Sequence, residues 1–178
     1  MNVDLLESVR RTIARDPDRF CAAQWAFACN ARQVLAEGAA PVGFRCCIAG
    51  HVLLESGTLT ERDLLRKGGF HTGGGLWNRA AAALEVGQQR SRALFFPSQW
   101  VHPFKKQYYL CAQEEEAQIA TTYLTHFIEK HGPSKARYAS APGGEVRGDG
   151  RPPRAPSADE ESAEALRFRS GVTGARSE

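Results

Sequence analysis

Hydrophobic residues recur at helical spacing near the N-terminus of the chain. Leu6, Val9 and Ile13 stand three and four residues apart, the spacing that places side chains on one face of a helix. Asp16-Pro17 follows, and a proline is favoured at the first position of a new helical turn. We therefore expect an amphipathic first helix that ends near residue 16.

The segment Phe44–Ser56 is apolar on both sides of a helix. Its only charged residues are Arg45 and Glu55, which lie near its ends. A helix that is apolar all round is buried, so this segment is predicted to be the central helix of the fold. Gly50 costs such a helix roughly 1 kcal/mol relative to alanine. Its presence indicates that a neighbouring element packs close to the backbone there.

The remaining pattern within residues 1–132 also favours helices. Residues 20–30 fit a short helix or a packed loop, and no alternating run of β-branched residues predicts a sheet. Short helices are expected at residues 61–67, 76–84, 89–96 and 104–111. The final helix has an apolar stripe formed by Ala120, Tyr123, Leu124, Phe127 and Ile128. The predicted fold is all-α, a bundle of five to seven helices around the central helix at about 44–56.

The composition changes at Gly132-Pro133. In the segment 133–178, 25 of 46 residues are proline, glycine, serine or alanine. Such a segment buries too little apolar surface to offset the entropy lost on ordering. The sequence thus predicts one helical domain over 1–132, followed by a disordered tail over 133–178.

Charge and hydropathy exclude several classes of protein. The net charge of +3, from 23 basic and 20 acidic residues, is too balanced for an obligate nucleic-acid coat, so nucleic acid is not an expected partner. No apolar run approaches the length of a membrane span, and the N-terminus lacks the pattern of a secretory signal. Together with an odd number of cysteines, five, this favours a reducing cytoplasm. An excess of arginine over lysine favours a bacterial origin.

One pair of residues could carry chemistry. Cys47 and His51 are four residues apart, so they share one face of the central helix. Near a helix N-terminus the dipole favours a thiolate, and His126 of the last helix could join the pair. Three interpretations remain open: packing residues of the core, a Cys–His catalytic or redox pair, and a metal site.

No cofactor or metal is specified by a motif. The cysteines form no Cys-x-x-Cys pair and match no zinc or iron–sulfur spacing. The glycine-rich loop at 68–75 lacks the sequences that cradle phosphate groups, and a flexible linker explains it. We therefore expect no bound cofactor and no metal site outside the Cys47–His51 pair, for which the metal interpretation stays open.

An aromatic cluster near residues 95–109 is the candidate contact surface. Its members are Phe95, Phe96, Trp100, Phe104, Tyr108 and Tyr109, and the candidate contact residues among them are Phe96, Trp100, Phe104 and Tyr108. Such residues close a small helical core in most proteins, but they also line grooves for small molecules and contact protein partners. A protein partner is expected, and a small-molecule ligand stays open as an alternative.

Four stretches of the sequence occur together: Cys47-Ile48-Ala49-Gly50-His51, Leu84-Glu85-Val86-Gly87, Leu94-Phe95-Phe96 and a final helix that ends at Gly132. This combination resembles a family of proteins. That family is a group of small bacterial and phage-type helical proteins with no established activity, and the resemblance covers about residues 1–132. It implies a compact helical domain and no particular chemistry. The leading hypothesis is a non-catalytic cytoplasmic binding or accessory protein. The alternative is a Cys/His-dependent enzyme or metal-binding protein that uses Cys47 and His51.

Overall fold

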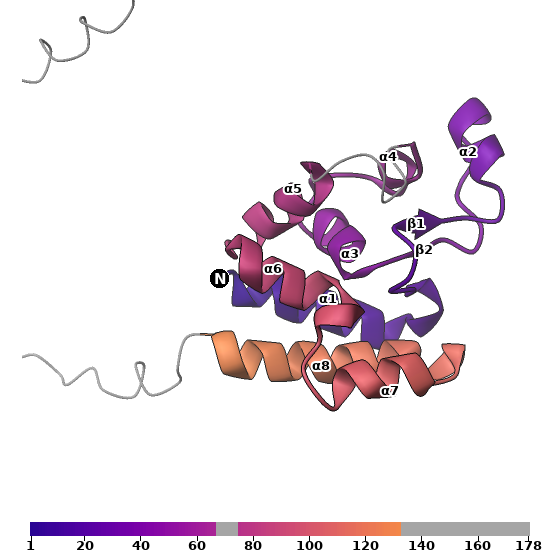
Figure 1. Ribbon diagram of the computed structural model, residues 1–178. Coiled ribbons are helices and arrows are strands. Elements are labelled where there is room, and N and C mark those ends of the chain that lie inside the picture. The colour runs from indigo at the N-terminus through magenta and orange to yellow at the C-terminus, as the bar shows by residue number, and fades with distance from the viewer. Residues whose placement is uncertain (67–74, 133–178) are drawn as a thin grey trace, which may run out of the picture. The chain divides into compact units, whose positions relative to one another are not determined.

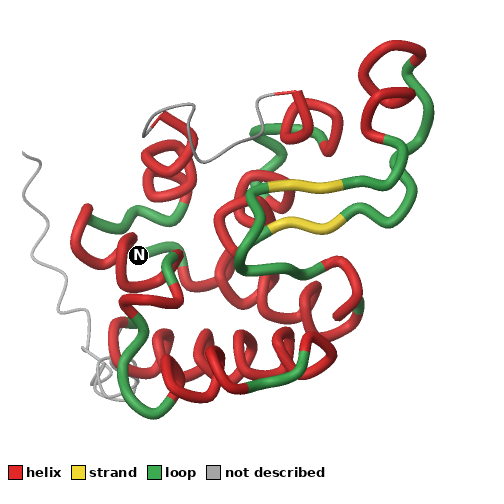
Figure 2. Tube along the Cα trace, turned by 45° about the vertical axis from the view of Figure 1, so that its right-hand side comes forward, coloured by secondary structure: helices red, strands yellow, loops and turns green. Residues whose placement is uncertain are grey.

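The computed structural model describes residues 1–66 and 75–132. Within these ranges the chain is mostly helical, with one small two-stranded sheet (Figures 1 and 2). The α-helices are α1 Val3–Arg15, α2 Ala31–Glu37, α3 Ile48–Glu55, α4 Glu61–Arg66, α5 Gly75–Ala83, α6 Gln88–Phe95, α7 Phe104–Leu110 and α8 Glu116–His131. The 3₁₀ turns are η1 Pro17–Arg19, η2 Pro97–Gln99 and η3 Gln113–Glu115, and the strands are β1 Ala26–Phe27 and β2 Arg45–Cys46.

The predicted helical class is confirmed, but the described residues hold eight α-helices where five to seven were expected. The pattern does not predict α2, because only Val34 of that helix is buried and the neighbouring Leu35 is exposed. A single buried residue produces no periodic stripe. The predicted disordered tail, 133–178, and residues 67–74 of the glycine-rich segment lie outside the described residues.

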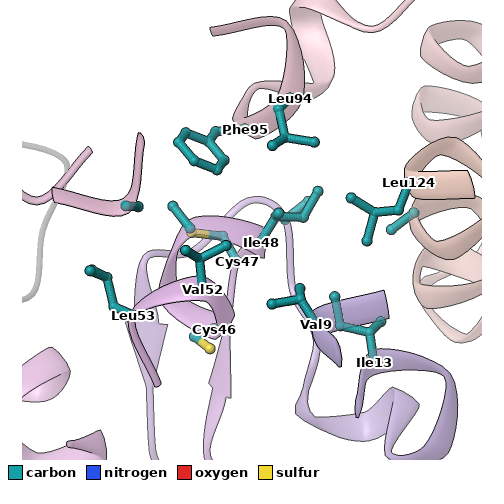
Figure 3. Close-up of a cluster of buried hydrophobic side chains, with 14 of the residues drawn as sticks. Val9, Ile13, Cys46, Cys47, Ile48, Val52, Leu53, Leu94, Phe95 and Leu124 are labelled. Carbon is teal, nitrogen blue, oxygen red and sulfur yellow. The ribbon is translucent and has the colours of Figure 1, made fainter. Parts of the chain in front are cut away.

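Helix α1 packs against both α3 and α8 and lies between them (Figure 1). Its buried residues are Leu6, Val9 and Ile13, the stripe that the spacing predicts. In the core, Val9 and Ile13 of α1 lie between α3 and Leu124 of α8 (Figure 3). The first helix therefore separates the central helix from the last one.

The central helix is shorter than the sequence pattern indicates. Residues Arg45–Cys46 form strand β2, which pairs antiparallel with β1, so the expectation of no sheet is also wrong (Figure 2). Cys47 has extended backbone angles and occupies the N-cap position, and α3 begins at Ile48. An apolar run buried on both sides looks the same to a periodicity test in a strand or in a helix. The backbone pairing with β1 makes residues 45 and 46 of this run extended instead of helical.

Helix α3 is buried from Ile48 through Leu53. The close-up in Figure 3 places Ile48 and Val52 of α3 among side chains from three other helices, α1, α6 and α8. The prediction of a buried central helix is thus confirmed for this shorter segment. Residues 20–30, for which the pattern left two interpretations open, form loops around strand β1.

Gly50 allows α3 to approach strand β2 closely. A Cβ atom at this position would lie 2.8 Å from Cys46 Cβ, 3.0 Å from Cys46 Sγ and 3.3 Å from the Trp25 carbonyl oxygen. A carbon–carbon approach of 2.8 Å is well inside van der Waals contact, where the atoms repel each other. The expected close packing at Gly50 is therefore confirmed, with strand β2 and the residue before β1 as the neighbours.

Replacement of Gly50 by alanine should destabilise the protein, although alanine is the better helix former. Overpacking of a tight core costs about 1–3 kcal/mol, which exceeds the roughly 1 kcal/mol gained in helix propensity. Gly75→Ala is the matched control, because a Cβ atom there meets nothing within 4 Å. Urea unfolding should show a lower midpoint for Gly50→Ala and an unchanged or higher one for Gly75→Ala. Equal midpoints for the two variants would contradict the close approach.

Candidate functional site

Cys47 lies at the N-terminus of α3, where the sequence places it, but it is only 1% exposed. Burial raises the pKa of its thiol to about 11, and hydrogen bonds from the backbone N–H groups of Gly50 and Ala49 lower the pKa by less. Desolvation disfavours the charged thiolate more strongly than the helix terminus favours it. The site does not supply the reactive thiolate that a nucleophilic role requires.

His51 follows one turn later on α3 and is 2% exposed. Its ring faces Phe20, with ring centroids 6.2 Å apart and an interplanar angle of 28°. Burial lowers the pKa of the imidazole to about 4, while a hydrogen bond to the Arg19 backbone opposes this shift. His51 is therefore neutral at pH 7, and its Nε2 atom has no hydrogen-bond partner among the described residues.

His126 does not join this pair. It lies on α8 beside Phe104, with ring centroids 5.4 Å apart, and lines a surface hollow of about 410 Å³ together with Arg10. The residues that line this hollow come from α1, α7 and α8, and α1 lies between α8 and α3 (Figure 1). Within residues 1–66 and 75–132, no group of three histidine, cysteine or acidic side chains is arranged to hold a metal ion.

The predicted contact residues close the core near α7. Trp100 is 3% exposed, and its indole N–H donates to the Leu94 carbonyl oxygen at 3.2 Å. Its ring stacks on Tyr123, with centroids 4.5 Å apart. Tyr108 packs edge-on against Trp100, and Phe104 packs edge-on against Tyr123. Trp100 is buried and Phe104 and Tyr108 are half-buried, and together these aromatic side chains hold α7 against α8.

Phe96 packs on the other side of the same region. Its ring stacks on Trp77 of α5, with centroids 4.6 Å apart. Trp77 also packs edge-on against Trp25, which precedes strand β1, with ring centroids 5.0 Å apart. Phe96 therefore joins α5 and α6 to the loop before β1 and is half-buried.

Three large apolar residues of the segment 95–110 are exposed. Val101 is 38% exposed, Tyr109 is 60% exposed and Leu110 is 73% exposed, and we call the pair Tyr109 and Leu110 the α7 ridge. Among the α-helices of the described residues, α7 is the one without a buried residue. The sequence contained a signal for the ridge, because the inward stripe of Phe104, Tyr108 and Cys111 leaves residues 109 and 110 on the outer side of the helix.

Two hollows flank the α7 ridge. One, of about 490 Å³, lies between α7 and α8 and is lined by Leu110 and Ile119. The other, of about 560 Å³, is lined by Tyr109 and by Phe27 of strand β1. Cys111, which follows α7, lines both hollows. The ridge is therefore a raised apolar strip with a depression on each side.

A carboxylate lies near the end of α7. Burial raises the pKa of Tyr108 well above its usual range, and the nearby Glu116 carboxylate raises it further. Glu116 is the first residue of α8 and is buried. Helices α7 and α8 pack against each other as a hairpin, which carries the α7 ridge (Figure 1).

Comparisons with protein-family models, with curated proteins and with solved structures found no match to this chain. No helix of the described residues is both long enough and apolar enough to cross a membrane.

The buried His51 predicts a dependence of stability on pH. The pKa of His51 is about 4 in the folded protein and 6.5 in the unfolded chain. Between pH 4 and pH 6.5 the unfolded chain therefore binds a proton at His51 that the folded protein does not bind. The free energy of unfolding is highest above pH 6.5, and it falls by roughly 1.5 kcal/mol between pH 6.5 and about pH 5. Urea unfolding at these two pH values measures the loss. His51→Gln should lose most of this dependence, and His126→Gln should keep it; the reverse pattern would contradict a neutral, buried His51.

Proposed function

We propose that the protein is a non-catalytic helical binding or accessory protein whose contact surface is the α7 ridge. The observation that carries this proposal is the exposure of Tyr109 and Leu110, side by side, on a helix without a buried residue. Helices this short gain their stability from packing. A partner that covers the ridge would supply burial that the chain itself does not provide.

The surroundings of the candidate nucleophile support a role without catalysis. The raised thiol pKa of Cys47 and the lowered imidazole pKa of His51 describe an uncharged pair with almost no access to water. A Cys–His catalytic pair needs a thiolate, or a base that can produce one, at a surface that a substrate can reach. Packing residues need neither of these features.

The charges around the α7 ridge favour a protein as the partner. Lys105 and Lys106 precede it, while Glu114 and Glu115 follow it, and all four side chains are exposed. Surfaces that bind nucleic acid carry an excess of positive charge, whereas mixed charges around an apolar centre are typical of protein interfaces. We further propose that the protein acts in the cytoplasm, since its five cysteines are free thiols.

Site-specific photo-cross-linking tests this proposal. Tyr109 is replaced by benzoylphenylalanine in the full chain, in the cells that produce the protein, and adducts are identified by mass spectrometry. Val42, on the loop between α2 and β2, is the control position, because it is equally exposed at 60% and its backbone N–H is held by Asn30 Oδ1 at 2.8 Å. We expect protein adducts from position 109 in clear excess over position 42. Equal or absent adducts at the two positions would overturn the proposed function.

A further inference from the structure

The hollow of about 560 Å³ beside the α7 ridge is lined from strands β1 and β2 and from the end of the hairpin, where α7 leads through η3 into α8 (Figure 1). Sites for small molecules have volumes of roughly 300–1,000 Å³. We propose that this hollow binds a small zwitterion, an α-amino acid with a large apolar or aromatic side chain. This inference goes beyond the proposed function, because such a ligand neither requires nor replaces a protein partner at the ridge.

Glu116 supplies the negative charge of this hollow. Its side chain lines the hollow, yet the residue is only 9% exposed. Within residues 1–66 and 75–132, no basic side chain forms an ion pair with its carboxylate. A buried carboxylate needs a cation or hydrogen-bond donors to compensate for the loss of water. The N-terminus of α8 provides part of this compensation, and the ammonium group of a ligand would provide more.

Arg45 of strand β2 supplies the positive charge. Its half-buried side chain lines the same hollow, and it also borders two neighbouring hollows that contain Asp18, Glu61 and Glu114. In the described part of the chain, no ion pair joins Arg45 to any of these acids or to Glu116. A guanidinium group binds a carboxylate through two parallel hydrogen bonds. The hollow therefore offers one group for the ammonium and one for the carboxylate of an α-amino acid.

The aromatic lining indicates the class of side chain. Phe27 is 43% exposed and Tyr109 is 60% exposed, and both line the hollow. Tyr108 lines it as well and packs edge-on against Tyr109, with ring centroids 5.2 Å apart. Apolar and aromatic walls around a few polar groups are typical of small-molecule sites. A ligand side chain that covers Phe27 and Tyr109 removes their apolar surface from water, which stabilises the complex.

The hollow beside His126 provides the matched comparison. It is also lined by one basic and one acidic residue, Arg10 and Glu129. There the Arg10 Nε atom lies 2.8 Å from Glu7 Oε2, and Glu129 is exposed to water. Both charges are therefore compensated without a ligand, and substitutions of these two residues serve as controls.

Isothermal titration calorimetry of the full chain with L-phenylalanine, L-leucine and L-tryptophan tests the ligand class. At least one of them should bind with a Kd below about 1 mM. Analogues of the tightest ligand that lack one charge, such as phenethylamine and 3-phenylpropionate for phenylalanine, should each bind at least about tenfold more weakly. Absence of binding by all three amino acids at about 10 mM, or an analogue that binds as tightly as its amino acid, would overturn the proposal.

Variants of the two charged residues locate the site. Glu116→Gln and Arg45→Gln should each weaken binding at least about tenfold, whereas Arg10→Gln and Glu129→Gln should leave it unchanged. Glu116→Gln should also lose the preference for the amino acid over the analogue without an ammonium group, a change that a general loss of structure does not produce. Far-UV circular dichroism checks the fold of each variant. Wild-type affinity in Glu116→Gln or Arg45→Gln, or equal losses in the controls, would contradict a site in this hollow.

Leu110 separates this proposal from the proposed function, because it belongs to the α7 ridge but does not line this hollow. Leu110→Ser should therefore bind the amino acid with wild-type affinity. Failure of the calorimetric test with cross-linked partners still found at position 109 overturns the ligand site alone. Amino-acid binding without such partners overturns the proposed function alone.

Discussion

The close approach of helix α3 to strand β2 is the contact on which the rest of the fold depends. It exists because Gly50 has no side chain, so that Cys46 and the Trp25 carbonyl group occupy the space where a Cβ atom would be. The approach holds residues 45–46 in a strand paired with β1 and lets α3 begin directly after Cys47. Helices α1, α5 and α6 then pack around α3.

The same contact decides the chemistry of the cysteine and histidine residues. A central helix surrounded on all sides removes Cys46, Cys47 and His51 from water, so burial outweighs every other influence on their pKa values. Residues that could react on a surface are uncharged packing groups here. At the periphery, α7 and α8 form a hairpin on which Tyr109 and Leu110 are exposed.

Sequence patterns predict the parts of this fold that are amphipathic and fail where burial is uniform or absent. The stripes of α1 and α8 are recognisable because each helix has one face in the core and one in water. Phe44, Cys46 and Cys47 are apolar and buried, so the pairing of β2 with β1 leaves no mark in the periodicity. Helix α2, with Val34 as its one buried residue, has no stripe to detect.

The candidate site illustrates a similar limit. The spacing of Cys47 and His51 shows that they share a helix face, but the access of water to that face depends on the helices packed against it. His126 lies across α1 from the pair, and no local pattern indicates this separation. Trp100 and Tyr108 pack inward, while the exposed positions beside Tyr108 follow only once the inward stripe of α7 is known.

Alkylation of the five native cysteines tests the central claim most directly. That claim is that Cys46 of β2 and Cys47 at the N-terminus of α3 are structural residues shielded from water. Mass spectrometry after brief iodoacetamide treatment of the reduced, folded protein should find Cys29 modified and Cys46 and Cys47 unmodified. Rapid modification of Cys47 in the folded protein would contradict the claim.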